Sequence, residues 1–378
     1  RIALVGVTTP AVERWKRPED LAGIRFLDGV RAAAEAVAEL QRRHRPDLII
    51  VAVHAGLGPV PPGPRGAARE RGSEDMAYRI AAEVRGIDAV VYGHSHRRES
   101  GLRAGDAVLV QPQHRGASVA RIDFRMERGS GRWKRTAVQS RLLPVRAATP
   151  ADPHVVQIAA RYHELTENYL NLQVAAAGAD LDARFASIRD SALIDAVHAV
   201  QLHYTGADVS FTAVFQPELR IVRGPVTVRR LAALYPFDND LCLIEGTGQM
   251  VKDALENSAR YFLQCRTPAC GQGPLRNRAI AAHNYDTAQG VSYEIDLRRP
   301  AGDRVRNLRW QGKPLDPHSR LRIALNSHRA AGGAGYAVFR SARILWRSSE
   351  DLRSLIVRYY APQGRLPASP DNNWRLFP

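Results

Sequence analysis

The spacing of apolar residues over the first 125 positions predicts alternating strands and helices. Residues 48–53 form a continuous, largely β-branched apolar run, which is the pattern of a strand buried on both faces. Runs at 2–7, 87–92 and 107–110 predict three further strands. Two helices are predicted between them: one over 30–40 with Val30, Ala33, Ala34 and Val37 on its apolar face, and one that Ser73 caps and that continues through Met76, Ala77, Ile80 and Val84.

A long helix with one polar face is predicted over residues 153–172, and it connects two units. Its apolar side is formed by Val155, Ile158, Tyr162, Leu165 and Tyr169. Before this helix, charged and glycine-rich residues at 125–135 indicate the edge of the first unit. The Pro/Gly/Arg-rich stretch at 59–72 is interpreted as a loop.

The second unit begins near residue 175 and mixes helices with strands. Strands are predicted over 290–297, where polar and apolar residues alternate, and over 321–326. A helix is predicted over 247–263, with Val251, Ala254, Leu255, Ser258 and Phe262 on its apolar face. The pattern therefore indicates an α/β protein with a layered first domain at 1–145, a linker helix at 150–174 and an α+β domain at 175–378.

The net charge of +16 raises the question of nucleic-acid binding. Nearly all of this charge comes from arginines, which are spread along the chain instead of forming one stripe. Arginine and alanine richness is explained more simply by codon usage in a GC-rich genome. We therefore expect no nucleic-acid partner, although an attraction for anionic substrates is compatible with this composition.

The compartment is only weakly indicated by the sequence. There is no run of 18 or more apolar residues, so no membrane span is predicted. The chain opens on an apolar segment without a methionine, and we expect an upstream piece that could carry an export signal. Cys265 and Cys270 could pair across a short loop or remain free thiols, while Cys242 in an apolar strand is interpreted as a core residue.

Three histidines follow two of the predicted strands. His54 ends the strand at 48–53, and His94 and His96 follow the strand at 87–92 in a Gly-His-Ser-His sequence. Because the carboxyl ends of neighbouring parallel strands meet at one edge of a sheet, we expect the three imidazoles to converge. Gly93 permits a sharp turn, and the i, i+2 spacing lets His94 and His96 point the same way. Imidazoles favour transition metals such as zinc, manganese, iron or cobalt.

His114 has no partner pattern in the sequence, and we interpret it as structural. His54, His94 and His96 could each be an ordinary surface or core histidine. Their placement after two buried strands favours a metal site instead.

These motifs, with Glu74-Asp75-Met-Ala-Tyr between them, resemble the calcineurin-like metallophosphoesterases that are fused to a 5′-nucleotidase C-terminal domain. Within that family the chain is most similar to the bacterial 2′,3′-cyclic-nucleotide 2′-phosphodiesterase/3′-nucleotidase group, over nearly its whole length. The resemblance implies a partial metallophosphoesterase α/β sandwich at 1–145 and a substrate-specificity domain at 175–378. It also implies a periplasmic or secreted protein.

The resemblance implies two divalent transition-metal ions, with His54 and His94 on one ion and His96 on the other. The family's remaining ligands come from Asp-x-His and Gly-Asn-His motifs and a bridging aspartate, which would lie upstream of Arg1 and are absent from this sequence. The histidine of Gly-Asn-His stabilises the transition state in that family. We therefore assign no catalytic acid or base to this chain.

The resemblance also implies a nucleotide-binding surface in the second domain. Tyr235-Pro-Phe237-Asp-Asn239 matches a segment in which the aromatic side chain stacks on the base and the asparagine bonds to it. The opposite wall would come from a glycine-rich loop containing Asn326, His328, Arg329, Gly332 and Gly333. His328 stands where the family has a tyrosine, so this half of the clamp is weaker or formed by imidazole. The alternatives are a core phenylalanine and an ordinary glycine-rich turn.

Hydrolysis of nucleotide phosphoesters is the first hypothesis, on 2′,3′-cyclic nucleotides with 3′-nucleotides or on 5′-nucleotides. A relative acting on a nucleotide sugar or a sulfur ester is the alternative among enzymes. The alternative among proteins that are not enzymes is one that binds nucleotide without catalysis. Oligomeric state is not indicated by the sequence.

Overall fold

The computed structural model describes residues 1–16, 18–60, 74–129, 131–265 and 276–377. These form two compact units, Arg1–Pro153 and His154–Pro378. The predicted capping by Ser73, most of the predicted loop at 59–72 and the pairing of Cys265 with Cys270 lie outside the described residues. No helix in the described part of the chain has the length and apolar character needed to cross a membrane.

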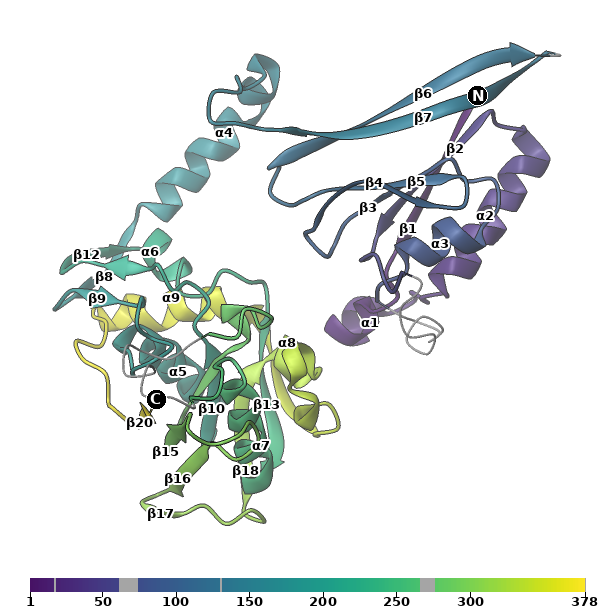
Figure 1. Ribbon diagram of the computed structural model, residues 1–378. Coiled ribbons are helices and arrows are strands. Elements are labelled where there is room, and N and C mark those ends of the chain that lie inside the picture. The colour runs from purple at the N-terminus through teal and green to yellow at the C-terminus, as the bar shows by residue number, and fades with distance from the viewer. Residues whose placement is uncertain (17, 61–73, 130, 266–275, 378) are drawn as a thin grey trace. The chain divides into compact units, whose positions relative to one another are not determined.

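The first unit is a five-stranded sheet in the order β1-β2-β3-β5-β4, in which all neighbours are parallel except β4 and β5. Helices and a long hairpin complete the unit (Figure 1). Its elements are β1 (Ile2–Thr8), α1 (Val12–Trp15), α2 (Gly29–His44), β2 (Leu48–His54), α3 (Ala77–Glu83), β3 (Ala89–Tyr92), β4 (Arg98–Ala104), β5 (Ala107–Pro112), β6 (Ser118–Gly129) and β7 (Arg132–Pro144).

Apolar side chains pack against both faces of this sheet. On one face, α2 and α3 bury Val30, Ala33, Val37 and Ile80 against the strands, as helical spacing predicts. On the other face, Ala89 and Val108 meet Val138 of the hairpin, with Ile122 and Phe124 packed around them. The fold class predicted from the sequence is thus confirmed as layered α/β.

The predicted strand at 2–7 is present as β1, but it is buried on one face only, with Ile2 65% and Leu4 72% exposed, because the hairpin packs against β4 and β5 instead of β1. Two local expectations for this unit were wrong. The charged residues near 125–135 lie within the β6–β7 hairpin and not at the edge of the unit. Helix α3 begins after Met76, which makes no side-chain cap.

The second unit contains a five-stranded sheet in the order β14-β10-β18-β13-β19 and a smaller sheet in the order β17-β16-β15-β20. Helices α5 and α9 pack on the larger sheet and on each other. Its elements are α4 (Pro153–Leu170), β8 (Gln173–Ala177), β9 (Leu181–Asp182), α5 (Ala192–Thr205), β10 (Val209–Ala213), β11 (Arg220–Ile221), β12 (Gly224–Thr227), α6 (Val228–Ala232), β13 (Asp240–Thr247), α7 (Gly248–Ala259), β14 (Asp286–Gln289), β15 (Val291–Asp296), β16 (Val305–Trp310), β17 (Lys313–Pro314), β18 (Arg320–Asn326), α8 (Ser327–Ala330), β19 (Ile344–Asp351), α9 (Leu352–Gln363) and β20 (Trp374–Phe377).

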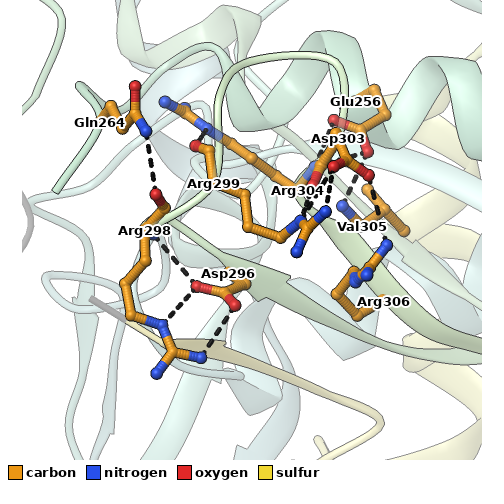
Figure 2. A network of polar contacts seen from close by, with 9 residues as sticks. All are labelled: Glu256, Gln264, Asp296, Arg298, Arg299, Asp303, Arg304, Val305 and Arg306. Carbon is orange, nitrogen blue, oxygen red and sulfur yellow. Dashed lines mark hydrogen bonds and ion pairs between the residues drawn. The ribbon is translucent and has the colours of Figure 1, made fainter. Parts of the chain in front are cut away.

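Helix α7 follows the predicted pattern and shows how this unit satisfies its buried polar groups. Thr247 caps its first turn through a hydrogen bond from the backbone N–H of Met250. At the other end, the buried Arg304 guanidinium donates to the carbonyls of Ala259 and Phe262 at 2.7 and 2.8 Å. The Glu256 carboxylate in turn accepts from the backbone N–H of Arg304 at 2.8 Å (Figure 2). Orphan carbonyls at the helix end are thereby paired inside the core.

Three carboxylates meet at the start of α5, where the C-terminal segment crosses it. Oxygens of Asp190, Asp195 and Asp371 all lie within 4.8 Å of one another. Burial, followed by the charges of Asp190 and Asp371, raises the pKa of Asp195 to about 8. Burial likewise raises the pKa of Asp190. The folded unit therefore holds a proton at Asp195 in a pH range where the unfolded chain would release it.

The raised pKa of Asp195 predicts that the free energy of unfolding depends on pH. Because the folded pKa of Asp195 lies above its unfolded value, stability present below about pH 4 is lost as the pH rises through about 8. The isosteric Asp195→Asn variant cannot ionise. We expect it to be more stable than wild type at pH 8.5 by about 1 kcal/mol or more, equivalent to roughly 2–4 °C in Tm.

Thermal unfolding in the presence of a chelator, at pH 5 and pH 8.5, measures this effect. Asp253→Asn, at an exposed aspartate of α7, is the matched control and should shift neither curve. An Asp195→Asn gain of the same size at both pH values would contradict the assigned cause.

Candidate functional site

The carboxyl ends of the parallel strands in the first unit open onto one hollow. The strand register places Thr8 opposite His54 and Val53 opposite Tyr92, so the strands end at nearly the same level. The hollow has a volume of about 630 Å³. Its walls are largely apolar and consist of Gly6, Val7, Thr8, Ala52, Val53, His54, Val91, Tyr92, Gly93 and Pro112.

His54, which lines this hollow, forms one pair of imidazoles with His94. Their ring centroids are 5.3 Å apart in an edge-to-face arrangement. The nearest atom to a Cβ placed on Gly93 is Nδ1 of His54, at 3.7 Å, so the glycine lies directly beside this ring. His94 Nε2 is 2.5 Å from a carboxylate oxygen of Glu74. That hydrogen bond raises the pKa of His94 above its usual value.

The acidic segment before α3 is held against the residues that follow His54. The backbone N–H groups of Met76 and Ala77 both donate to the carbonyl of Gly56 at 3.1 Å. A Cβ on Gly56 would lie 1.9 Å from Oδ1 of Asp75, so a larger residue here would have to displace the Asp75 carboxylate. The small residues after His54 therefore let the acidic segment approach, and this approach brings Glu74 to His94.

His96 and His114 form a second pair. Their rings stack with centroids 4.7 Å apart and planes 21° from parallel. Burial, then the neighbouring His114, lowers the pKa of His96, and the charges of His94 and His54 contribute in the same direction. His114, which we interpreted as structural from the sequence, thus belongs to the same cluster of imidazoles.

The backbone of the histidine loop differs from the strand geometry assumed for an i, i+2 pair. His94 and His96 follow β3 in a loop, and both are left-handed, with φ of 66° and 57°. Strand alternation therefore does not set the direction of their rings. Non-glycine residues in this conformation carry strain of about 1 kcal/mol or more each, which persists only where the surroundings enforce it.

The buried side chain of Gln111 enforces this conformation. From β5, its Nε2 donates to the carbonyl of Gly93 at 2.5 Å, and its Oε1 accepts from the backbone N–H of Arg97 at 2.7 Å. The hydroxyl of Ser95 also donates to Oε1, at 3.0 Å. Sequence reasoning missed Gln111, because a single glutamine in an apolar strand has no recognisable motif.

The chemistry of these donors fits divalent transition metals. Three exposed or half-buried imidazoles and a nearby carboxylate are ligands that such ions accept. Within the described residues, Asp190, Asp195 and Asp371 form the cluster of three potential ligands whose atoms lie within 4.8 Å of one another. The histidines instead approach in pairs, so ligands additional to theirs would be needed to complete an ion's coordination.

In the second unit, Phe237 lies in a cluster of rings with one side open. It is 42% exposed, and its ring centroid is 5.3 Å from that of Phe215 and 6.0 Å from that of His283. Asn239 is half-buried and accepts a hydrogen bond from the Tyr235 hydroxyl at 3.2 Å. Phe215 and His283 were not identified from the sequence; their proximity to Phe237 arises only from the packing of distant segments.

The glycine-rich loop follows β18. Asn326 is buried and caps α8 by accepting from the backbone N–H of Arg329 at 2.9 Å. The exposed ring of His328 lies over Gly333, where a Cβ would come within 2.3 Å of the imidazole. Gly332 is left-handed with φ of 81°. The glycines therefore let this loop turn and let the imidazole lie flat on its backbone.

Arg329 is buried, in contrast to the exposed His328 that precedes it. Its side chain is 2% exposed and forms two hydrogen bonds to the Asp286 carboxylate, at 2.7 and 2.8 Å. It also donates to the carbonyl of His283 at 2.6 Å, and its guanidinium lies over the Tyr336 ring at 4.7 Å. In this structure Arg329 holds the loop against β14 and the segment that carries His283.

Comparison with known proteins identifies the domain that makes up much of the second unit. Residues 168–341 match the model of the 5′-nucleotidase C-terminal domain. The trifunctional nucleotide phosphoesterase protein YfkN of Bacillus subtilis is 25% identical over 424 residues, covering 100% of this chain and 28% of that protein. The 2′,3′-cyclic-nucleotide 2′-phosphodiesterase/3′-nucleotidase of Haemophilus influenzae is also 25% identical, covering 100% of this chain and 65% of the relative.

Among solved structures, a putative 5′-nucleotidase from Staphylococcus aureus superposes with a TM-score of 0.78 at 24% identity, over 99% of this chain and 72% of the other. The chain spans about a quarter and about two thirds of the length of the two curated relatives named above. Residues 168–341 thus form a 5′-nucleotidase C-terminal domain, and the chain has the fold of the calcineurin-like 5′-nucleotidases.

Proposed function

We propose that the protein hydrolyses phosphoesters of nucleotides, either 2′,3′-cyclic nucleotides together with 3′-nucleotides, or 5′-nucleotides. The observation that carries this proposal is the grouping of imidazoles at the carboxyl ends of β2 and β3, in a chain that also contains a 5′-nucleotidase C-terminal domain. Similarity to proteins named nucleotidases and cyclic phosphodiesterases supports the same class of substrate.

We assign two divalent transition-metal ions to this site. His54 and His94 would hold one ion and His96 the other. Such ions polarise phosphoryl oxygens and lower the pKa of a bound water. Glu74 lies against His94 and would orient that ring or contribute an oxygen ligand. Gln111 holds the loop between the histidines, so the chain positions the ligands before any ion binds.

The second unit supplies recognition of the base. The open side of Phe237 would stack on a nucleobase, and Asn239 would bond to the edge of that base. His328 on the glycine loop would form the opposite wall, with Asn326, Gly332 and Gly333 shaping the loop. Arg329 would act through the position of that loop and of His283, since its side chain is buried and its Nε and Nη2 donors are already engaged.

The test of the proposed function is phosphate release by the full-length gene product. The protein is stripped with a chelator, its metal content is measured, and activity is assayed before and after adding Zn²⁺, Mn²⁺ or Co²⁺. Cyclic, 3′- and 5′-nucleotides are compared with a nucleotide sugar and a sulfur ester. Metal-dependent release from a nucleotide supports the proposal. Nucleotide binding without turnover would support a binding protein, and faster turnover of the nucleotide sugar or sulfur ester would support that alternative.

Removing the Phe237 ring is expected to weaken nucleotide binding specifically. A base stacked on an aromatic ring is worth about 1–3 kcal/mol, so Phe237→Ala should raise KM for nucleotides by about tenfold or more. The variant should leave hydrolysis of a simple aryl phosphoester unchanged, because that substrate carries no base. Phe185→Ala is the matched control, since Phe185 is 43% exposed in the same unit and is flanked by arginines. An unchanged nucleotide KM in Phe237→Ala would rule out the base clamp.

We further propose a periplasmic or secreted location, on the basis of the family resemblance. Fractionation of cells that express the full-length gene product measures this directly. Recovery of the protein with cytoplasmic markers would contradict it.

A further inference from the structure

His114 belongs to the cluster of imidazoles at the candidate site, and no sequence motif identifies it. It lies in the loop after β5, and its ring stacks on that of His96, with centroids 4.7 Å apart and planes 21° from parallel. Its Nδ1 is buried and has no hydrogen-bond partner among the described residues. The side chain as a whole is half-buried, whereas His96 is exposed. The stack on His114 is therefore a contact that limits the position of the exposed His96 ring.

The two loops that carry these rings are fastened to each other. The backbone N–H of Gln113 donates to the carbonyl of Arg97 at 3.0 Å. The hydroxyl of Ser118 closes the second loop by donating to the carbonyl of Pro112 at 2.7 Å. Gln113 and Arg115, on either side of His114, are left-handed with φ of 72° and 55°. The loop thus adopts an uncommon backbone conformation on both sides of the residue that meets His96.

The geometry of the stack argues against His114 as a ligand of the same ion as His96. The lone pair of an imidazole nitrogen lies in the plane of its ring. Rings that are stacked nearly parallel direct their lone pairs side by side, whereas two ligands of one ion must direct them toward one point. Edge-to-face rings such as His54 and His94, with planes 63° apart, meet that requirement far better.

We propose that His114 is a positioning residue, which fixes the His96 imidazole in the orientation needed for metal binding by stacking on its face. This inference rests on the proposed metal-dependent function. It assigns no proton transfer and no metal bond to His114. It requires a flat ring at position 114, and it does not require a nitrogen there.

Two variants separate stacking from ligation. His114→Phe keeps a flat ring and removes both nitrogens, while His114→Ala removes the ring. Loss of a group that orients a metal ligand typically costs 10–100-fold in metal affinity. We therefore expect His114→Ala to lose at least tenfold in affinity for one of two ions, and His114→Phe to stay within about threefold of wild type.

The measurement is titration of the chelator-stripped, full-length gene product with Co²⁺ and Zn²⁺, following the Co²⁺ absorption bands and the number of ions bound. His44→Ala removes an exposed imidazole at the end of α2 and controls for adventitious binding. Equal losses in both His114 variants would make His114 a ligand and overturn the proposal. Wild-type affinity in His114→Ala would also overturn it. No metal binding by wild type would instead refute the proposed function. If His114→Ala fails to fold, His114→Phe still decides between stacking and ligation.

Discussion

Replacing His94 with alanine is expected to lower kcat/KM for nucleotide hydrolysis by about a thousandfold. His94 contacts both His54 and Glu74. The ring centroids of His94 and His54 are 5.3 Å apart, and Nε2 of His94 is 2.5 Å from a carboxylate oxygen of Glu74. Its loss would open the coordination of one ion and release Glu74 from the site. A metal ion that stabilises transition-state charge is worth several kcal/mol, and about 4 kcal/mol corresponds to a thousandfold in rate.

The variant is assayed for kcat/KM and for bound metal under the same conditions. His318→Ala, at an exposed histidine of the second unit, should leave both values unchanged. Because His94 has a φ of 66°, alanine at this position retains backbone strain. His94→Gly removes that strain, so a similar loss in both variants would assign the effect to the imidazole. A His94→Ala protein with nearly wild-type rate and metal content would contradict the site.

Breaking the buried pair of Arg329 and Asp286 is expected to be the most destabilising change in the second unit. The two side chains are 2% and 0% exposed, and two hydrogen bonds join them. Burial by itself would lower the pKa of Arg329, but the charge and hydrogen bonds of Asp286 raise it overall. Arg329→Met would leave the Asp286 carboxylate buried without its cation. Removing one partner of a buried ion pair typically costs about 3–5 kcal/mol.

Chemical denaturation of wild type, Arg329→Met and the double variant Arg329→Met with Asp286→Leu measures this cost. The double variant should lose less than the sum of the single losses, because neither charge is then left unpaired. Arg343→Met removes a partner from an exposed ion pair with Glu245 and should change stability by less than about 1 kcal/mol. If Arg329→Met is as mild as this control, Arg329 does not hold the loop as described.

The sequence alone was sufficient to predict those helices and strands whose buried face can be recognised from their own apolar residues. The apolar run at 48–53 forms the interior strand β2, and Val251, Ala254 and Leu255 form part of the buried face of α7. In such elements each side chain reports directly on the face it occupies. The β6–β7 hairpin escaped prediction because its strands are half-exposed and rich in arginine, so their pattern is close to that of a surface loop.

For the candidate site, the sequence by itself determined that His54, His94 and His96 follow two buried strands, and parallel pairing of those strands then brings them to one edge. Only the tertiary structure decided which ring meets which: His94 with Glu74, and His96 with His114. It also decided that Arg329 is used inside the core. These contacts join segments separated by 18 or more residues, and spacing along a chain carries no information about the direction in which a loop side chain turns.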